Sequence, residues 1–150
     1  MNVDQICSRK VVTIHRNDGI LEAARRMREE HVGDLVVVEE QADRIVPVGI
    51  LTDRDIVVGV LAKDGQHLDV LDVGDVVTAD LVTASEDEDL DTVLRRMRSF
   101  GVRRVPIVNS GGGLEGVLSL DDIIDALSED MAELAALVSR QRRREAARRP

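Results

Sequence analysis

The sequence predicts an α/β (α+β) fold in which two β-α-β-β-α repeats pack as a pseudo-twofold pair and an extended helix follows them. Three observations predict it. The segment GILTDRDI at residues 49–56 recurs as GVLSLDDI at residues 116–123, and VVT at residues 11–13 recurs as LVT at residues 81–83. Between these segments, both copies show the same order of apolar and amphipathic stretches. Beyond the second copy, apolar residues continue at helical spacing.

The first repeat is expected to span residues 1–65. In residues 19–30, apolar and polar residues alternate with a helical period, which places Ile20, Ala23 and Met27 on one face. Unbroken runs of β-branched residues, by contrast, are typical of buried strands. The expected elements are a strand at 11–14, a helix at 19–30, a buried strand at 35–38, a polar loop at 39–44, a strand at 45–51 and a helix at 53–62. One such unit alone leaves a sheet face or strand edges exposed, so two copies must pack together.

The second repeat, at residues 73–128, is expected to follow the same order after a linker at 66–72. Its expected elements are a strand at 81–83, a helix at 90–100, a strand at 104–108, a hairpin loop at 110–113, a strand at 114–118 and a helix from residue 120. Pro106 cannot donate a ladder hydrogen bond, so its strand is expected at a sheet edge or to begin there. Leu68 and Leu71 indicate that the linker packs on the body.

Residues 129–150 are expected to form a C-terminal amphipathic helix with an Arg-rich tail. Apolar residues recur three or four positions apart, at Ile123, Leu127, Met131, Leu134 and Val138. This stripe is wide enough to need a partner. Ser128, followed by two acidic residues, also fits the N-cap of a new helix, so the sequence leaves open whether the helix is continuous or breaks there.

The charge distribution limits the partners of the chain. The formal net charge is −9 at pH 7, although residues 140–150 hold six Arg and one Glu. An acidic body repels nucleic acid and anionic membranes, and the chain has no Trp or Tyr and a single Phe on which bases stack. We therefore expect neither a nucleic acid nor a membrane as a partner. Nucleic-acid binding by the Arg-rich tail is a minor hypothesis.

No segment indicates export or membrane insertion. The longest apolar run, residues 56–62, is far shorter than the roughly 18 residues that a membrane-spanning helix needs. The N-terminus lacks the layout of a signal peptide. Cys7 is the single cysteine, so no intrachain disulfide forms. These observations predict a cytoplasmic protein.

Enzyme signatures are missing from the sequence. His15, His31 and His67 are scattered, and none has the spacing of a zinc site. There is no nucleophile elbow, P-loop or dinucleotide-binding glycine motif. The glycines at 111–113 precede a strand, where a hairpin turn explains them. We expect a protein that is not an enzyme, with no catalytic residue, no bound metal and no required cofactor.

The recurring segment places a hydroxyl residue three positions before an Asp, where a strand meets a helix. The pairs are Thr52 with Asp55 and Ser119 with Asp122. One interpretation is a capping box, in which the hydroxyl and the carboxylate bind backbone N–H groups. The other is a ligand site, in which the helix N-terminus and hydroxyl receive a phosphate and the carboxylate binds a ribose diol. Both can hold at once.

Two adjacent cations, Arg103 and Arg104, precede the apolar run at 105–108. Neighbours on a strand face opposite ways, so one of them is expected to reach a cleft while the other meets solvent. Two solvated edge charges are the alternative.

The two copies resemble a tandem pair of cystathionine-β-synthase-type (CBS) motifs, the Bateman module. The resemblance lies in the copies VVTIHRNDGILEAARRMREEHVGDLVVVEE…VPVGILTDRDI and LVTASEDEDLDTVLRRMRSFGVRRVPIVNSGGGLEGVLSLDDI, and it covers roughly residues 3–126. It implies two clefts between the repeats, assembly into a homodimer, and a sensor of adenine nucleotides or related adenosyl ligands.

The resemblance also implies roles for particular residues. The ribose-binding Asp falls on Asp55 and Asp122, and the phosphate-side hydroxyl on Thr52 and Ser119. Arg54 is expected beside a phosphate in the first cleft, whereas Asp121 and Leu120 replace Arg54 and Asp53 in the second copy, which makes the second cleft less suited to several phosphates. The segments expected to line the adenine pockets consist of Val11, Val12, Thr13, Leu81, Val82 and Thr83.

From these observations we expect a non-catalytic regulatory module that binds an adenosine-containing ligand, AMP, ADP, ATP or S-adenosylmethionine, in clefts between the repeats. The better cleft is expected to be the one built on Thr52, Arg54 and Asp55. The alternative is a ligand-free assembly or protein-interaction module that acts through its dimer faces and C-terminal helix. An unidentified protein partner is compatible with both hypotheses.

Overall fold

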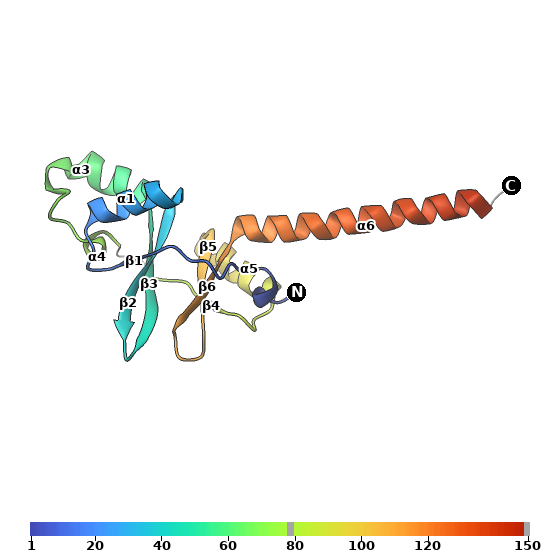
Figure 1. Ribbon diagram of the computed structural model, residues 1–150, viewed down its shortest axis with the longest axis horizontal. Helices are drawn as coiled ribbons and strands as arrows, with labels where there is room; N and C mark the ends of the chain where they lie inside the picture. Colours follow the sequence, from blue (N-terminus) through green and yellow to red (C-terminus); the bar gives the residue numbers. More distant parts are fainter. Residues whose placement is uncertain (78–79, 149–150) are drawn as a thin grey trace.

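The computed structural model describes residues 1–77 and 80–148, which form two three-stranded sheets with flanking helices and one long C-terminal helix (Figure 1). The strand order is β1-β2-β3 in the first sheet and β4-β5-β6 in the second. In each sheet the first two strands are parallel and the last two are antiparallel. This topology confirms the predicted α+β fold with two equivalent repeats.

The first repeat follows the predicted order, with one correction. Its elements are β1 (Thr13–His15), α1 (Ile20–Glu30), β2 (Asp34–Gln41), β3 (Arg44–Thr52), α2 (Asp53–Ile56), the π-helical η2 (Val57–Leu61) and α3 (Ala62–Asp64). The polar loop predicted at 39–44 is wrong, because β2 and β3 stay paired until Gln41 faces Arg44. Ala42 and Asp43 form a two-residue turn with φ values of 48° and 66°. Positive φ at both positions matches the right-handed twist of a tight hairpin.

The second repeat contains β4 (Ala84–Ser85), α5 (Leu90–Phe100), β5 (Arg104–Val108) and β6 (Leu114–Ser119). The predicted hairpin loop before β6 is confirmed. The prediction for Pro106 is wrong, because β5 is the central strand of its sheet and Pro106 lies inside it, opposite Val117. Pro106 is tolerated because β4 pairs with β5 only at Ile107 and Val108. No ladder bond is therefore required of it.

The segment that precedes each repeat packs on the other repeat. The 3-10 helix η1 (Val3–Gln5) buries Val3 in the core of the second repeat, and the short helix α4 (Val73–Val76) buries Val73 in the core of the first. Val73 also donates its backbone N–H to the Asp18 carbonyl at 2.8 Å. Another 3-10 turn, η3 (Gly65–His67), precedes α4. The linker therefore packs on the body, as its apolar residues predict, and the chain crosses between the repeats twice.

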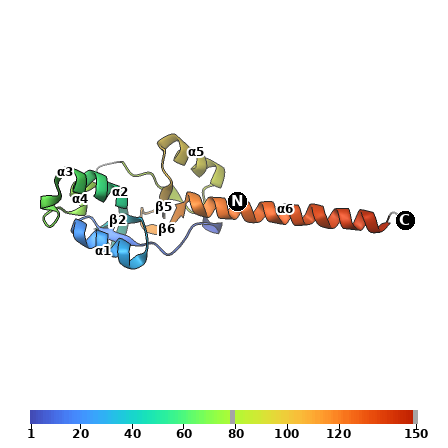
Figure 2. The same ribbon diagram turned by 90° about the horizontal axis from the view of Figure 1, so that it is seen from above.

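Each sheet buries its own apolar core against its first long helix. The largest fully buried side chains are Ile14, Ile20, Leu35, Leu51, Ile107, Leu118 and Ile123. A smaller apolar cluster of Val36, Val38 and Val117 joins the two sheets. Figure 2 shows the two repeats side by side, with α1 and α5 on the outer sides of their sheets. The sheets therefore face each other across an interface at which β3 and β6 meet.

The C-terminal helix α6 (Leu120–Arg148) is continuous and extends away from both repeats (Figures 1 and 2). The break considered at Ser128 does not occur. Only the start of α6, where Ile123 is buried, packs on the second sheet. Within the part of the chain that the structure describes, no helix combines the length and the apolar character needed to cross a bilayer.

Candidate functional site

A cleft between the two sheets is lined by residues of both repeats. We call it the main cleft. Its volume is about 480 Å³, within the range of roughly 300–1,000 Å³ that is typical of small-molecule sites. The side chains and backbone that line it come from both repeats: Asp34, Gly49, Ile50, Thr52, Val77, Asp80, Leu81, Val82, Val102, Arg103, Arg104, Ser119, Leu120 and Asp121.

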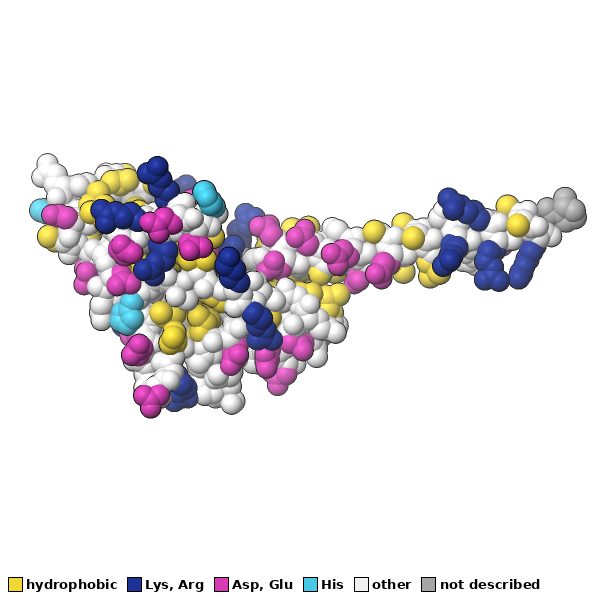
Figure 3. All heavy atoms as spheres, viewed as in Figure 1, with side chains coloured by type: hydrophobic (Ala, Val, Ile, Leu, Met, Phe, Trp, Pro, Cys, Tyr) yellow, Lys and Arg dark blue, Asp and Glu magenta, His cyan; other side chains and the backbone are white. Residues whose placement is uncertain are grey.

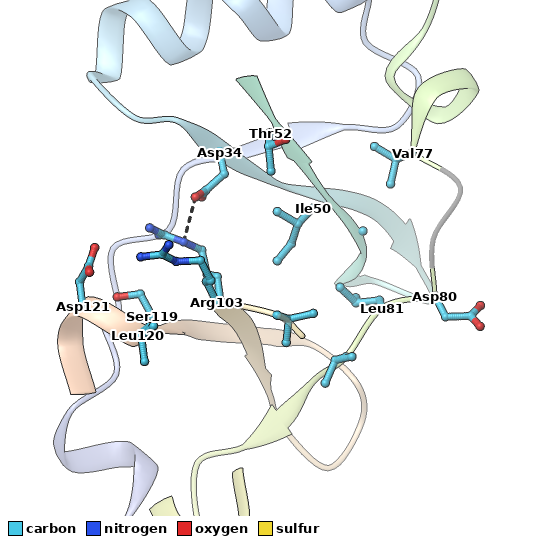
Figure 4. A pocket seen from close by; sticks show the side chains of 14 residues that line it. Asp34, Ile50, Thr52, Val77, Asp80, Leu81, Arg103, Ser119, Leu120 and Asp121 are labelled. Atoms are coloured by element: carbon cyan, nitrogen blue, oxygen red, sulfur yellow. Dashed lines mark ion pairs between the residues drawn. The ribbon is translucent and has the colours of Figure 1, made fainter. Parts of the chain in front are cut away.

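The main cleft has a polar end and an apolar end (Figure 4). Asp34, Arg103, Ser119 and Asp121 gather at one end, whereas Ile50, Val77 and Leu81 lie toward the other, where Asp80 is the one charged side chain among the described lining residues. Val82 and Val102 add to the apolar lining. A ligand with a flat apolar part and a polar part therefore fits this layout, with aliphatic side chains in place of aromatic ones.

The main cleft joins the first segment of one repeat to the last strand of the other. Leu81 and Val82 belong to the second repeat, whereas Ile50 and Thr52 belong to β3 of the first. Gly49 makes this crossing possible, because a Cβ at this position would collide with the Val77 side chain. The equivalent Gly116 has the same role, since a Cβ there would lie 2.7 Å from the Ser8 carbonyl oxygen.

A missing hydrogen bond keeps the first segment of the second repeat away from its sheet. In the first repeat, the Val36 N–H donates to the Val12 carbonyl at 3.1 Å. Pro106 occupies the position equivalent to Val36 and has no N–H to donate to Val82. The strand predicted at 81–83 is therefore wrong in position, because the strand of this repeat is β4 at Ala84–Ser85, whereas β1 has three residues. The backbone of Val82 therefore lies free of the ladder at the wall of the main cleft.

An ion pair spans the polar end of the main cleft. The Arg104 Nε lies 3.0 Å from the Asp34 Oδ2 (Figure 4). Burial raises the pKa of Asp34 above its ordinary value, and this effect outweighs the lowering by Arg104. Asp34 and Arg104 occupy equivalent positions of the two repeats. The pair therefore lies where the two halves of the molecule meet.

Both hydroxyl-x-x-Asp motifs form capping boxes. The Thr52 Oγ1 accepts from the Asp55 N–H at 3.0 Å, and the Asp55 Oδ2 accepts from the Thr52 N–H at 2.9 Å. The same pair of bonds joins Ser119 and Asp122, at 3.1 and 3.2 Å. The capping interpretation therefore holds in both copies. Because each hydroxyl oxygen acts as an acceptor in its box, its O–H stays free to donate into the main cleft.

The residues expected around the first motif line two different cavities, although the capping box joins Thr52 to Asp55. Thr52 lines the main cleft, but Arg54 and Asp55 line a separate groove of about 640 Å³ with Lys63, His67 and Asp75. The three residues of the predicted site, Thr52, Arg54 and Asp55, therefore do not line one common cavity. Thr52 ends β3 and faces the second repeat, whereas the two residues in the first turn of α2 turn toward the linker.

The second copy differs from the first at this point. Asp121, which replaces Arg54, lines the main cleft together with Ser119, whereas Asp122 lines neither this cleft nor the groove. Arg103 and Arg104 both line the main cleft, and Arg103 is the one that is also exposed to solvent, whereas Arg104 is half-buried. Strand alternation does not separate them, because β5 begins at Arg104 and Arg103 lies before it.

The equivalent cleft on the other side is much smaller. We call it the small cleft. It encloses about 80 Å³ and is lined by Lys10, Val11, Val12, Val32, Asp34, Val36, Arg104 and Val117. Val11 and Val12 occupy the places that Leu81 and Val82 take in the main cleft. The first-strand residues predicted to line two ligand pockets thus line two cavities of unequal size.

The remaining two predicted residues, Thr13 and Thr83, contribute backbone carbonyls to equivalent anchors. Arg26 donates to the Thr13 carbonyl at 2.7 Å, and Arg96 donates to the Thr83 carbonyl at 2.9 Å. Arg96 is also held by Glu88, at 2.6 Å. The hydrogen bond from Arg96 lowers the pKa of Glu88. These arginines fix the segments that lead into the clefts.

Comparison with known proteins identifies the family of this chain. A profile of the CBS domain matches residues 3–61 and 73–129. The chain belongs to the CBS domain family. The predicted tandem CBS pair is thereby confirmed, and the two matched segments correspond to the two repeats.

Relatives and solved structures agree with this CBS pair. An uncharacterised protein of Methanopyrus kandleri is 32% identical over 124 residues, which cover 83% of this chain and 61% of that protein. An uncharacterised 17.7 kDa protein of Acidianus ambivalens is 38% identical over 125 residues, covering 83% and 72%. The crystallised CBS domain pair of protein MJ0100, in complex with 5′-methylthioadenosine and S-adenosyl-L-methionine, superposes with a TM-score of 0.72 at 28% identity, covering 87% of this chain and 98% of that one.

Sequence reasoning missed several contributors to the main cleft of this CBS pair, among them Asp34, Ile50 and Val102. Asp34 and Ile50 belong to the first repeat but face the second, and Val102 follows a helix end. The sequence does contain a signal for Asp34: when the repeats are aligned, this acidic residue stands opposite the basic Arg104. Ile50 carried none, since an apolar residue in a strand next to the motif is typical of a core. Among the described residues, no cluster of three or more His, Cys, Asp or Glu side chains is arranged to hold a metal.

Proposed function

We propose that this CBS pair is a non-catalytic regulatory module that binds one adenosine-containing ligand in the main cleft. The proposal rests on one observation: a single cavity has aliphatic side chains at one end and hydroxyl and guanidinium groups at the other. The ligands of the MJ0100 pair, 5′-methylthioadenosine and S-adenosyl-L-methionine, have the same division between a flat base and a polar part.

The base is expected to lie between aliphatic side chains at the apolar end. Ile50 comes from one repeat, and Leu81 and Val82 come from the other, so the ring is held between them. The Val82 carbonyl, which Pro106 leaves without a ladder donor, is placed to accept a hydrogen bond from an exocyclic amine. A free backbone acceptor beside an apolar slot favours adenine over a base that presents a carbonyl at that position.

The ribose and its substituent are expected at the polar end. Thr52 and Ser119 present hydroxyls, and Arg103 supplies a cation that is free of the Asp34–Arg104 pair. This end of the lining carries two carboxylates, Asp34 and Asp121, and two guanidinium groups, whereas Asp80 lies beside Leu81 at the other end (Figure 4). This balance disfavours a triphosphate, because no net positive charge at this end offsets several added negative charges. We therefore expect 5′-methylthioadenosine, S-adenosylmethionine and AMP to bind more tightly than ATP.

Titration of the purified chain with these four compounds tests the function. A ligand at about 100 times its Kd should add roughly 2.7 kcal/mol to the free energy of unfolding, visible as a thermal shift. Arg103→Ala combined with Ser119→Ala should weaken AMP binding, whereas Arg54→Ala, in the separate groove, should leave it unchanged. No shift with any compound, or equal losses in both variants, would contradict ligand binding in the main cleft.

A second candidate function, assembly through the C-terminal helix, is favoured by the exposed apolar side chains of α6. Truncation after Ser128 separates the two functions. A ligand sensor retains its nucleotide affinity after the truncation, whereas an assembly module loses self-association or partner binding. Homodimerisation and a cytoplasmic location remain predictions of the sequence. Tail-mediated nucleic-acid binding is tested by deleting residues 140–150.

A further inference from the structure

Most of α6 has no contact surface within its own chain. All residues from Leu127 to Arg148 are exposed, and the helix extends into solvent as a single rod (Figure 1). Several of the exposed residues are large and apolar: Met131 is 67% exposed, Leu134 is 59% exposed and Val138 is 48% exposed. Helices in water gain most of their stability by packing an apolar face. The outer half of α6 therefore has an apolar face that the described part of its own chain does not cover.

The apolar residues of α6 follow the seven-residue pattern of a two-stranded coiled coil. Ile124, Leu127, Met131, Leu134 and Val138 succeed one another at alternating spacings of three and four. All five are exposed. They form one narrow seam, which we call the α6 seam. A seam of this width is covered by a single partner helix.

Charge is divided between the two halves of α6. The acidic half, next to the body, carries Asp121, Asp122, Asp125, Glu129, Asp130 and Glu133. The basic half carries Arg140, Arg142, Arg143, Arg144 and Arg148, with Glu145 as its one acidic residue. Figure 3 shows the acidic side chains over the half of the helix next to the body and the basic ones toward its far end. Each half of α6 is thus complementary to the other half of a second copy.

We propose that α6 pairs with α6 of a second copy in an antiparallel coiled coil. One register both pairs the residues of the α6 seam and brings acidic residues opposite basic ones. It places Met131 opposite Leu134, Leu127 opposite Val138 and Ile124 opposite Gln141, the residue numbers in each pair adding to the same total. The same register brings Asp121 of one helix beside Arg142 of the other, at positions that flank the seam.

The charges select this orientation over the parallel one. A parallel pair would lay six carboxylates against six and the Arg cluster against itself, which is destabilising at each position along the seam. An antiparallel pair of identical helices is related by a twofold axis through its centre. Its interface is therefore closed and does not propagate into a filament.

The mass of the full-length chain in solution tests the pairing. We expect a twofold-symmetric assembly whose mass falls by half when Leu134→Asp places a charge at the centre of the seam. Ala136→Asp adds the same charge two residues away, on the opposite face of the helix, and should leave the mass unchanged. The circular dichroism of both variants is compared to confirm that the repeats stay folded. An unchanged mass for Leu134→Asp, or equal dissociation of both variants, would overturn the pairing.

A distance measurement tests the orientation. A spin label at Ala147→Cys, in a Cys7→Ser background, reports the separation between the two copies by pulsed electron resonance. The antiparallel register predicts roughly 45 Å between labels, at about 1.5 Å of rise per residue. A parallel pair places the labels within about 20 Å of each other. The short distance, or an absence of any defined distance, would overturn the antiparallel pair.

Discussion

The main cleft and the small cleft occupy equivalent places in two copies of one fold, yet one is open and the other is nearly filled. Their volumes are about 480 and 80 Å³. The difference follows from the backbone. The Val36 N–H holds the Val12 carbonyl at 3.1 Å and draws that segment onto its sheet, whereas Pro106 provides no such bond. The main cleft is therefore open because β5 lacks, at Pro106, the backbone N–H that draws the equivalent segment onto the first sheet.

The largest effect on this comparison is expected from filling the open cleft. Ile50→Glu places a carboxylate among aliphatic side chains where the base is expected, and burying an unpaired charge costs several kcal/mol. We expect binding of 5′-methylthioadenosine to fall by more than about 100-fold. Isothermal titration measures the loss. Arg54→Glu adds the same charge in the separate groove and serves as the control, since it should change affinity far less.

Replacing Pro106 with a residue that has a backbone N–H should make the two clefts more similar in size. Pro106→Val restores an N–H opposite Val82, so the carbonyl returns to the ladder and is lost to the ligand. One hydrogen bond is worth about 1 kcal/mol, so affinity should fall roughly 5-fold. Amide hydrogen exchange should show protection at the new residue. Unchanged affinity together with a protected amide would show that the Val82 carbonyl is not part of the ligand site.

A third change keeps both clefts intact and loosens one of the segments that line them. Arg96→Ala removes the donor to the Thr83 carbonyl and the ion-pair partner of Glu88, which keeps its hydrogen bond from the Ser85 N–H. We expect a loss of affinity of about 3-fold, since one anchor of a cleft wall disappears. Arg26→Ala removes the equivalent anchor of the small cleft. It should destabilise the chain to a similar extent without changing affinity.

The smallest effect concerns the charge shared by both clefts. Asp34→Asn removes one carboxylate and releases Arg104, so AMP should bind about 2-fold more tightly while cationic S-adenosylmethionine binds less tightly. Equal changes for both compounds would contradict an electrostatic cause.

The same carboxyl group should make stability depend on pH. Burial raises the folded-state pKa of Asp34 above 3.8. Its contribution to stability is therefore fully present below pH 3.8 and is lost as the pH rises through the raised pKa. Asp34→Asn should flatten this part of the profile when unfolding is measured by denaturant titration across the acidic range.

Local patterns in the sequence were sufficient to predict the helices and strands, but not which of their residues contact each other between the repeats. The duplicated motif and the helical spacing in residues 20–30 and 90–100 define helices that the structure confirms. The polar residues at 39–44 looked like a loop because the hairpin tip is exposed on both faces. Neither the alternation of apolar residues nor the charge marks such a strand.

The composition of the clefts was harder to predict, for a geometric reason. Each cleft joins segments of opposite repeats, and spacing along the chain carries no information about that crossing. The position of Arg54 depends on the phase of a short helix, which turns by about 100° per residue. One step of this rotation moves a side chain from one cavity to another. Thr52, at the end of a strand, was easier to place.

The exchange of leading segments, with Val3 in one core and Val73 in the other, has a consequence for how the chain acquires its structure. The first repeat cannot complete its core until residue 73 has been synthesised, and residue 3 has no binding site until the second repeat exists. Contacts between residues so far apart raise the contact order and slow folding. The two repeats therefore fold as one cooperative unit, and neither is expected to survive as an independent fragment.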